Sequence, residues 1–96
     1  MRELRIRPRA VADLEEIWLY TLERWGAAQA DRYLRNINDA LGQLRTNPES
    51  GRPAETIRAG YRSLHVGRHL VFYAFDDEVI SVRRVLHDQM DFWRHV

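Results

Sequence analysis

The chain has no cysteine and no lysine, and only three prolines and five glycines among its 96 residues. The absence of cysteine excludes disulfide scaffolds, thiolate zinc sites and cysteine nucleophiles, and it is compatible with a reducing compartment. No stretch approaches the roughly 18 apolar residues of a membrane span, and the N-terminus lacks the apolar core of a signal peptide. The sequence therefore predicts a cytoplasmic protein with no membrane partner.

A large excess of charge of one sign is also missing. The 15 basic side chains are all arginine, and 14 acidic residues leave a formal net charge of +1. Whole-chain electrostatics therefore do not favour general nucleic-acid binding, and any basic function must come from local clustering. We expect no direct sequence-specific nucleic-acid binding by the chain alone. With 45% hydrophobic residues, this length suits one modest core and predicts a single domain over residues 1–96.

The first half of the chain has the periodicity of a short strand followed by two helices. Apolar and basic residues alternate over residues 4–6 until Pro8, which suits the first turn of a helix. Apolar residues then recur at steps of three and four up to Gly26, where the first helix should end. A second such pattern over residues 30–44 forms a narrow seam suited to an antiparallel partner helix. This half therefore predicts a helical hairpin.

After the turn-rich residues 47–53, the period changes to two. Residues 61–66, 69–76 and 79–87 are predicted to form three strands, joined by two-residue turns suited to tight hairpins. The predicted order is β-α-α-β-β-β. This is an α+β fold in which an N-terminal strand precedes an antiparallel two-helix hairpin packed on one face of an antiparallel sheet.

Strict alternation divides the strand residues between two faces. The face expected to pack on the helices is nearly all apolar and contains Leu64, Val66, Leu70, Phe72, Ala74, Ile80, Val82 and Leu86. The opposite face would contain Tyr61, Ser63, His65, His69, Val71, Tyr73, Phe75, Arg83, Val85 and His87. An uncovered face so rich in apolar and aromatic residues is typical of a partner surface. The alternative is that arginine stems and the loop near Pro48 cover it.

Arg84 falls by parity on the core side of the third predicted strand. A buried guanidinium needs a carboxylate, which the first helix could supply from Asp13, Glu15 or Glu16. Asp13 is the preferred partner because it precedes an apolar residue of the helix face that should meet the sheet. We expect a structural ion pair between Asp13 and Arg84.

Three histidines share the face that alternation leaves open, with Arg62 and Arg83 nearby in sequence. Metal binding is not favoured, because no Cys-x-x-Cys or His-Glu-x-x-His spacing makes the ligands converge; no metal and no cofactor is expected. RNA cleavage would use His87 as the acid-base residue, with Arg62 or Arg83 stabilising phosphate charge. The structural alternative, which we favour, is that these histidines cap hairpins and fill a partly polar interface.

The C-terminal residues 91–96 are too few to form a core of their own. Trp93 therefore either tucks against the sheet or is presented to a partner, and an aromatic side chain beside Arg94 would make an effective interface anchor.

Taken together, the chain resembles the ParE branch of the RelE/ParE toxin superfamily over nearly its whole length. The resemblance is carried by Ala12-Asp13-Leu14 with Ile17 and Tyr20, Gly26 and Ala30, Pro48 with Gly51-Arg52, Gly60-Tyr61-Arg62-Ser63, Gly67 with His69, Phe72-Tyr73, and Arg84-Val85-Leu86-His87 with Met90-Asp91. No single piece is decisive, but their order and spacing make the resemblance strong.

The resemblance implies the toxin of a bacterial type II toxin-antitoxin module, neutralised by a ParD-like antitoxin. Such an antitoxin has a ribbon-helix-helix DNA-binding part and a flexible C-terminal segment that wraps the toxin. Characterised ParE members inhibit DNA gyrase, whereas RelE-like relatives with the same fold are ribosome-dependent mRNA endoribonucleases. The fold alone does not distinguish gyrase inhibition from mRNA cleavage. The lack of lysine and the balanced charge favour gyrase inhibition by binding, without catalysis. A third possibility is a copy that has lost toxicity.

These implications give two sets of expected contact residues. For target binding the set is His87, Met90, Asp91, Phe92, Trp93 and Arg94. For antitoxin binding the set is Tyr61, His65, His69, Val71, Tyr73, Phe75 and Val85, all from the face predicted to be open.

Overall fold

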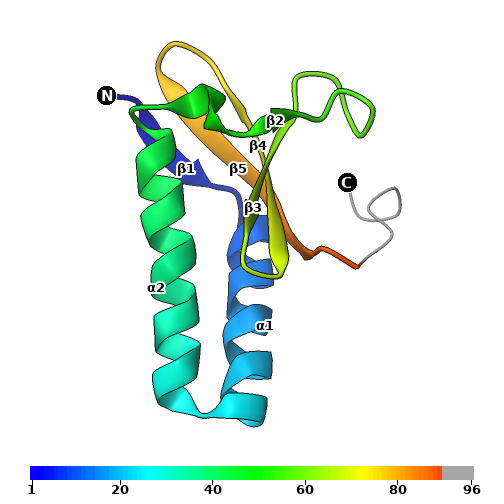
Figure 1. Cartoon of the computed structure of the whole chain (residues 1–96). Coiled ribbons are helices and arrows are strands. Elements are labelled where there is room, and N and C mark those ends of the chain that lie inside the picture. Colours follow the sequence, from blue (N-terminus) through cyan, green and yellow to red (C-terminus); the bar gives the residue numbers. More distant parts are fainter. Residues whose placement is uncertain (90–96) are drawn as a thin grey trace.

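The computed structural model describes residues 1–89, in which a helical hairpin packs on one face of a sheet (Figure 1). Its elements are β1 (Glu3–Ile6), α1 (Pro8–Trp25), α2 (Ala27–Leu44), the 3-10 turn η1 (Pro48–Ser50), β2 (Arg52–Pro53), β3 (Arg62–Val66), β4 (His69–Phe75) and β5 (Val79–His87). The predicted fold class is confirmed, with the short β2 as an addition. Within residues 1–89, no helix is both long enough and apolar enough to cross a membrane.

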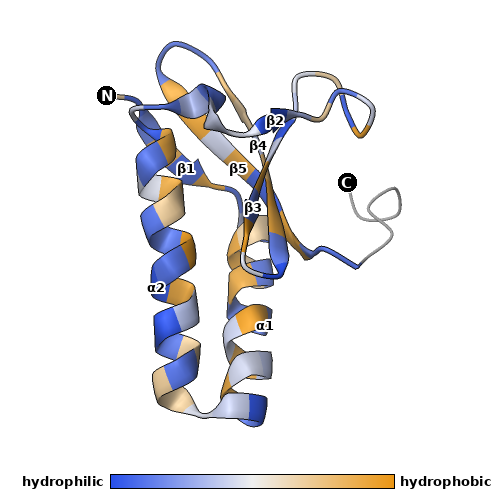
Figure 2. Ribbon diagram, viewed as in Figure 1, coloured by the Kyte–Doolittle hydropathy of each residue, from blue (hydrophilic) through white to orange (hydrophobic). Residues whose placement is uncertain are grey.

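The helices begin and end where the local sequence requires. Pro8 occupies the first turn of α1, where its missing N–H costs nothing. Gly26 ends the helix at φ +89°, a conformation that favours glycine, and its N–H donates to Leu22 O at 2.9 Å. Along α2, apolar residues recur between longer hydrophilic stretches (Figure 2). This apolar stripe places Ile37 and Leu41 in the core.

The sheet is mixed, whereas the sequence predicted an antiparallel one. Its strand order is β1-β5-β4-β3-β2, and β3, β4 and β5 form the predicted antiparallel meander, but β1 pairs with β5 in parallel. The helical hairpin brings the chain back to where it started, since Arg2 N–H donates to Arg45 O at 3.2 Å. Strand β3 therefore runs in the same direction as β1. Two hairpins connect β3 to β5, so β5 also runs in that direction.

Strand β5 contains a bulge at Arg83. Phe72 pairs with Arg84 and Tyr73 with Val82, so Arg83 is an extra residue without a partner on β4. The bulge shifts the alternation of β5. As a result, Val82 and Val85, three residues apart, both lie in the helix-side core.

The prediction that Val71, Tyr73, Phe75 and Val85 lie on an open face was wrong. Val71, Tyr73 and Val85 belong to the buried cluster that contains the core residues of both helices, and Phe75 packs against it. Cross-strand partners share a face of the sheet. Because Val66 pairs with His69 across the two-residue turn, His69 and alternate residues of β4 after it face the helices. The bulge then brings Val85 to the same face.

The opposite face is covered by residues 54–61. Four residues that strict alternation assigned to the helix side instead pack there, namely Leu70, Phe72, Ala74 and Leu86. Ala54, Ile57 and Tyr61 close over them, so that Phe72 is only 2% exposed. This apolar face of the sheet is therefore covered by a segment of the chain itself.

The Tyr73 hydroxyl fixes the segment that leads to this cover. It donates to Pro48 O at 2.6 Å and accepts from Gly51 N–H at 3.0 Å. A Cβ on Gly51 would lie 2.5 Å from the Tyr73 hydroxyl oxygen, so only glycine permits this approach.

Candidate functional site

The α1–β5 groove runs between helix α1 and the C-terminal half of β5. Strand β1 pairs with residues 79–82 only, so the rest of β5 has no strand neighbour on that edge. A groove of about 470 Å³ occupies this place. It is lined by Asp13, Glu16, Ile17, Tyr20, His69, Arg84, Val85, Leu86 and His87. Ile17 and Val85 provide an apolar floor beside an open strand edge.

The Asp13–Arg84 ion pair closes one end of the groove. Arg84 Nε and Nη2 donate to the two carboxylate oxygens of Asp13 at 2.8 and 2.9 Å, and Val85 N–H donates to Asp13 Oδ2 at 2.9 Å. Both side chains are about one-tenth exposed, at 11% and 10%. The hydrogen bond to Asp13 raises the pKa of Arg84 above its usual value. The structure thus contains the ion pair expected from the sequence, and it ties α1 to the edge of β5.

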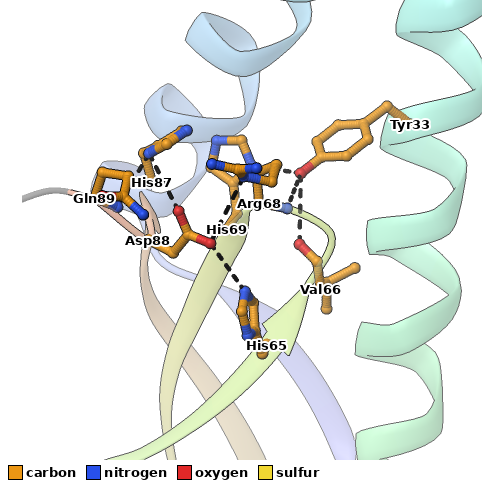
Figure 3. Close-up of polar contacts among 8 residues, drawn as sticks. All are labelled: Tyr33, His65, Val66, Arg68, His69, His87, Asp88 and Gln89. Atoms are coloured by element: carbon orange, nitrogen blue, oxygen red, sulfur yellow. Dashed lines mark hydrogen bonds and ion pairs between the residues drawn. The ribbon is translucent and has the colours of Figure 1, made fainter.

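At the other end, a histidine cluster joins the groove to the β3–β4 turn (Figure 3). Tyr33 OH lies 2.5 Å from His69 Nδ1 and accepts a hydrogen bond from Arg68 N–H at 3.0 Å. The His69 and His87 rings meet edge to face at 5.3 Å between centroids. Burial, and then the charge of His87, lower the pKa of His69 to about 4, so His69 is neutral near pH 7. Burial also raises the pKa of Tyr33.

Asp88 is the acidic residue of this cluster. Its Oδ2 lies 3.2 Å from His65 Nε2 and 3.8 Å from Arg68 Nε, and its Oδ1 lies 3.5 Å from His87 Nδ1. Burial alone would raise the pKa of Asp88, but the hydrogen bond with His65 and the positive charge of Arg68 hold it below its usual value. His65 reaches Asp88 from the loop-covered face, since its partner on β4 is Leu70.

The three residues predicted for ribonuclease chemistry are not brought together. Arg62 pairs with Tyr73 whereas His87 pairs with His69, four positions along β4, which corresponds to roughly 13 Å. The Arg62 guanidinium donates to the carbonyls of Glu49 and Gly51, at 3.1 and 2.8 Å.

Arg83 lies over the Tyr61 ring, 6.0 Å from its centroid, and neither residue lines the α1–β5 groove. Within residues 1–89, no group of three or more histidine, aspartate or glutamate side chains is arranged to hold a metal ion.

Five of the residues predicted to bind the target lie outside the described residues, namely Met90, Asp91, Phe92, Trp93 and Arg94.

Of the predicted antitoxin contacts, His69 and Val85 line the groove, whereas Tyr61 and His65 belong to the opposite side of the sheet. Sequence reasoning did not assign Tyr33 or Asp88 to the site. Asp88 directly follows His87, and that adjacency was the available signal.

Comparison with solved structures first defines the class of fold. The chromosomal ParDE toxin-antitoxin system from Pseudomonas aeruginosa contains a chain that superimposes with a TM-score of 0.80 at 23% identity, over 91% of this chain and 96% of that one. The two chains therefore share one fold over nearly their whole length.

Sequence relatives then define the family. Toxin ParE1 of Mycobacterium tuberculosis is 46% identical over 92 residues, or 95% of this chain and 94% of the relative. Toxin ParE1 of Caulobacter vibrioides is 40% identical over 96 residues, or 100% and 99%. The model of the family described as "ParE toxin of type II toxin-antitoxin system, parDE" matches residues 4–92. The chain belongs to the family of ParE toxins of type II toxin-antitoxin systems, as the sequence resemblance predicted.

Proposed function

We propose that a ParD-like antitoxin neutralises this toxin by laying its C-terminal segment in the α1–β5 groove. The observation that carries the proposal is the unpaired half of β5 beside an apolar floor. An extended segment added to an open strand edge gains main-chain hydrogen bonds, while side-chain pockets provide specificity. Val71 and Tyr73 are fully buried and are removed from the proposed contact set. His69 and Val85 line the groove and are kept in the set, and Tyr20 is added to it.

Tyr20→Arg tests this docking site. Tyr20 is 57% exposed at the rim of the groove, so the change places a charge beside the apolar floor without disturbing the core. We expect antitoxin affinity to fall at least ~10-fold, because one desolvated interface anchor contributes on the order of 1–2 kcal/mol. Calorimetric titration with the ParD-like antitoxin would measure the loss.

Leu19→Arg is the matched control. Leu19 is 52% exposed on the same helix but lines a different depression, on the outer side of the hairpin. It should leave antitoxin affinity unchanged. If Leu19→Arg weakened binding and Tyr20→Arg did not, the antitoxin would dock on the outer side of the hairpin and the groove proposal would be wrong.

We further propose that the toxin inhibits DNA gyrase by binding rather than by cleaving messenger RNA. Membership of the ParE family supports this target, and the occupied guanidinium of Arg62 argues against a phosphate-stabilising role. The proposed contact set is His87 with Met90, Asp91, Phe92, Trp93 and Arg94. An aromatic side chain beside an arginine has the composition of a binding hot spot.

Deletion of residues 92–96 tests the target-binding segment. We expect growth inhibition to be lost, because the proposed Trp93 and Arg94 anchor is removed, and antitoxin affinity to stay within about twofold. Plasmid supercoiling and transcript integrity, followed together after induction, identify the target of the intact toxin. DNA breaks with intact messages fit gyrase inhibition, whereas early transcript cleavage would establish the RelE-like activity. No growth inhibition by the intact chain would indicate a copy that has lost toxicity.

A further inference from the structure

Exposed arginines surround a hollow at the start of α1, which we call the arginine hollow. It has a volume of about 350 Å³ and is lined by Arg7, Pro8, Arg9, Arg58, Tyr61, Arg83 and Arg84. Arg84 also lines the α1–β5 groove, so the hollow and the groove are neighbours, separated at the Asp13–Arg84 ion pair.

Three separate features of the fold bring these arginines together. Arg7 and Arg9 flank Pro8 at the beginning of α1. Arg58 comes from the segment that covers the second face of the sheet. Arg83 is the bulged residue of β5, and its guanidinium lies over the Tyr61 ring. Bulges re-aim side chains near functional sites, and here the bulge separates Arg83, which lines the hollow, from Arg84, which binds Asp13.

Within residues 1–89, no acidic side chain lines the hollow, and the first turn of α1 has neither an acidic residue nor a side-chain cap. The ion pairs formed within residues 1–89 do not include Arg7, Arg9 or Arg83. Like charges held this close repel one another, and the uncapped start of an 18-residue helix adds further positive potential. The arrangement favours an anion.

We propose that the arginine hollow binds phosphate groups of a nucleic-acid backbone. Guanidinium groups match phosphate oxygens bidentately, and nucleic-acid interfaces are far more positively charged than protein interfaces. An acidic peptide fits less well, because protein interfaces are anchored by apolar cores, and Pro8 and Tyr61 are the uncharged residues that line the hollow. Binding of this kind is independent of base sequence, and it goes beyond the proposed functions of the groove and the C-terminal segment.

The test compares two double variants of the full chain that change net charge equally. Arg9→Gln with Arg83→Gln removes two charges from the hollow, and Arg32→Gln with Arg35→Gln removes two exposed charges from α2. Fluorescence anisotropy of a labelled DNA duplex would be measured across salt concentrations. We expect the hollow variant to bind roughly tenfold more weakly and its log–log salt slope to shrink by about two, since each lost phosphate contact removes about one.

The α2 variant should bind the duplex as the unaltered protein does. Equal loss in both variants would overturn the proposal, because net charge alone would then explain binding, and so would the absence of duplex binding at low salt. Orthophosphate and polyglutamate at matched ionic strength separate the sources of negative charge. If orthophosphate raised Tm through these arginines but the duplex did not bind, or if polyglutamate bound as tightly as DNA, the backbone assignment would be wrong. None of these outcomes depends on gyrase or on the antitoxin.

Discussion

Helices α1 and α2 cover one face of the sheet, whereas the irregular segment of residues 54–61 covers the other. The helix-covered face holds the larger cluster, with fully buried residues from both helices and from β4 and β5. The loop-covered face holds four buried residues, namely Ala54, Tyr61, Phe72 and Leu86. Burial against two regular helices is cooperative, while a loop opens locally at lower free energy. The comparison therefore predicts that stability resides mainly on the helix side, where the α1–β5 groove also lies.

Asp13→Ala should have the largest effect. It leaves the Arg84 guanidinium, 11% exposed, without its carboxylate and leaves Val85 N–H without its acceptor. Breaking a buried ion pair from one side costs about 3–5 kcal/mol. Denaturant unfolding measures the loss. Adding Arg84→Met should recover much of it, because no uncompensated charge then remains. A loss within about 0.5 kcal/mol would show that the helix face does not depend on this contact.

A matched pair of isoleucines compares the two faces directly. Ile37, a residue of α2, is fully buried in the helix-side core, and Ile57 is partly buried in the loop cover. Ile37→Ala should cost about 2–5 kcal/mol, since it removes buried methyl groups and leaves a cavity, whereas Ile57→Ala should cost about 1 kcal/mol. Equilibrium unfolding of both variants would decide. Equal costs would mean that the loop cover is as much a part of the cooperative core as the helices.

A smaller effect than that of Asp13→Ala or Ile37→Ala should appear with pH at His69. Its folded-state pKa of about 4 lies below the ordinary histidine pKa of 6.5, so between these values the unfolded chain takes up a proton that the folded chain does not. The contribution of neutral His69 to the free energy of unfolding is complete above about pH 6.5 and is lost as the pH falls towards 4. Because His69 is only half-buried, solvent screening reduces it to on the order of 1–2 kcal/mol. Thermal unfolding across this range would measure it.

His69→Asn is the control for that pH profile. An asparagine side-chain amide can donate to Tyr33 OH or accept from it, as His69 Nδ1 can, but it does not titrate, so the profile of the variant should be flatter between pH 4 and 6.5. A profile unchanged from that of the parent protein would assign the pH dependence to other groups.

The sequence predicted the two helices and the β3–β4–β5 meander because their periodicities are strong over long segments. Gly26 marked the end of α1 for a steric reason that operates locally. The charge argument for Arg84 was also correct, because a buried guanidinium needs a carboxylate whichever way the local alternation runs. These features depend on neighbouring residues or on one unavoidable electrostatic requirement.

Local sequence patterns did not show which residues of β4 face the helices. Val71, Phe72 and Tyr73 are all buried, so hydrophobicity does not distinguish the side under the helices from the side under the loop. The two-residue turn contained the needed information, since it pairs Val66 with His69 on one face. The bulge at Arg83 has no such signature in the sequence.

For the site, the sequence identified His69, Val85 and His87, which the structure brings to the groove. It could not identify the groove itself, which exists because β1 stops at Ile6 while β5 continues to His87. Strand lengths of this kind depend on pairing between distant segments. The arginine hollow could not be predicted from the sequence either, because its basic residues are far apart along the chain.

The bulge divides β5 into two parts with different neighbours on one edge. Up to Val82, the strand pairs with β1, and Ile80 and Val82 lie in the helix-covered core. Beyond Arg83 the strand lies alongside the groove, outside the reach of β1. A deletion of one residue at the bulge would exchange the two faces for residues 84–87. The extra residue therefore keeps Val85 in the helix-side core while Arg83 lines the arginine hollow.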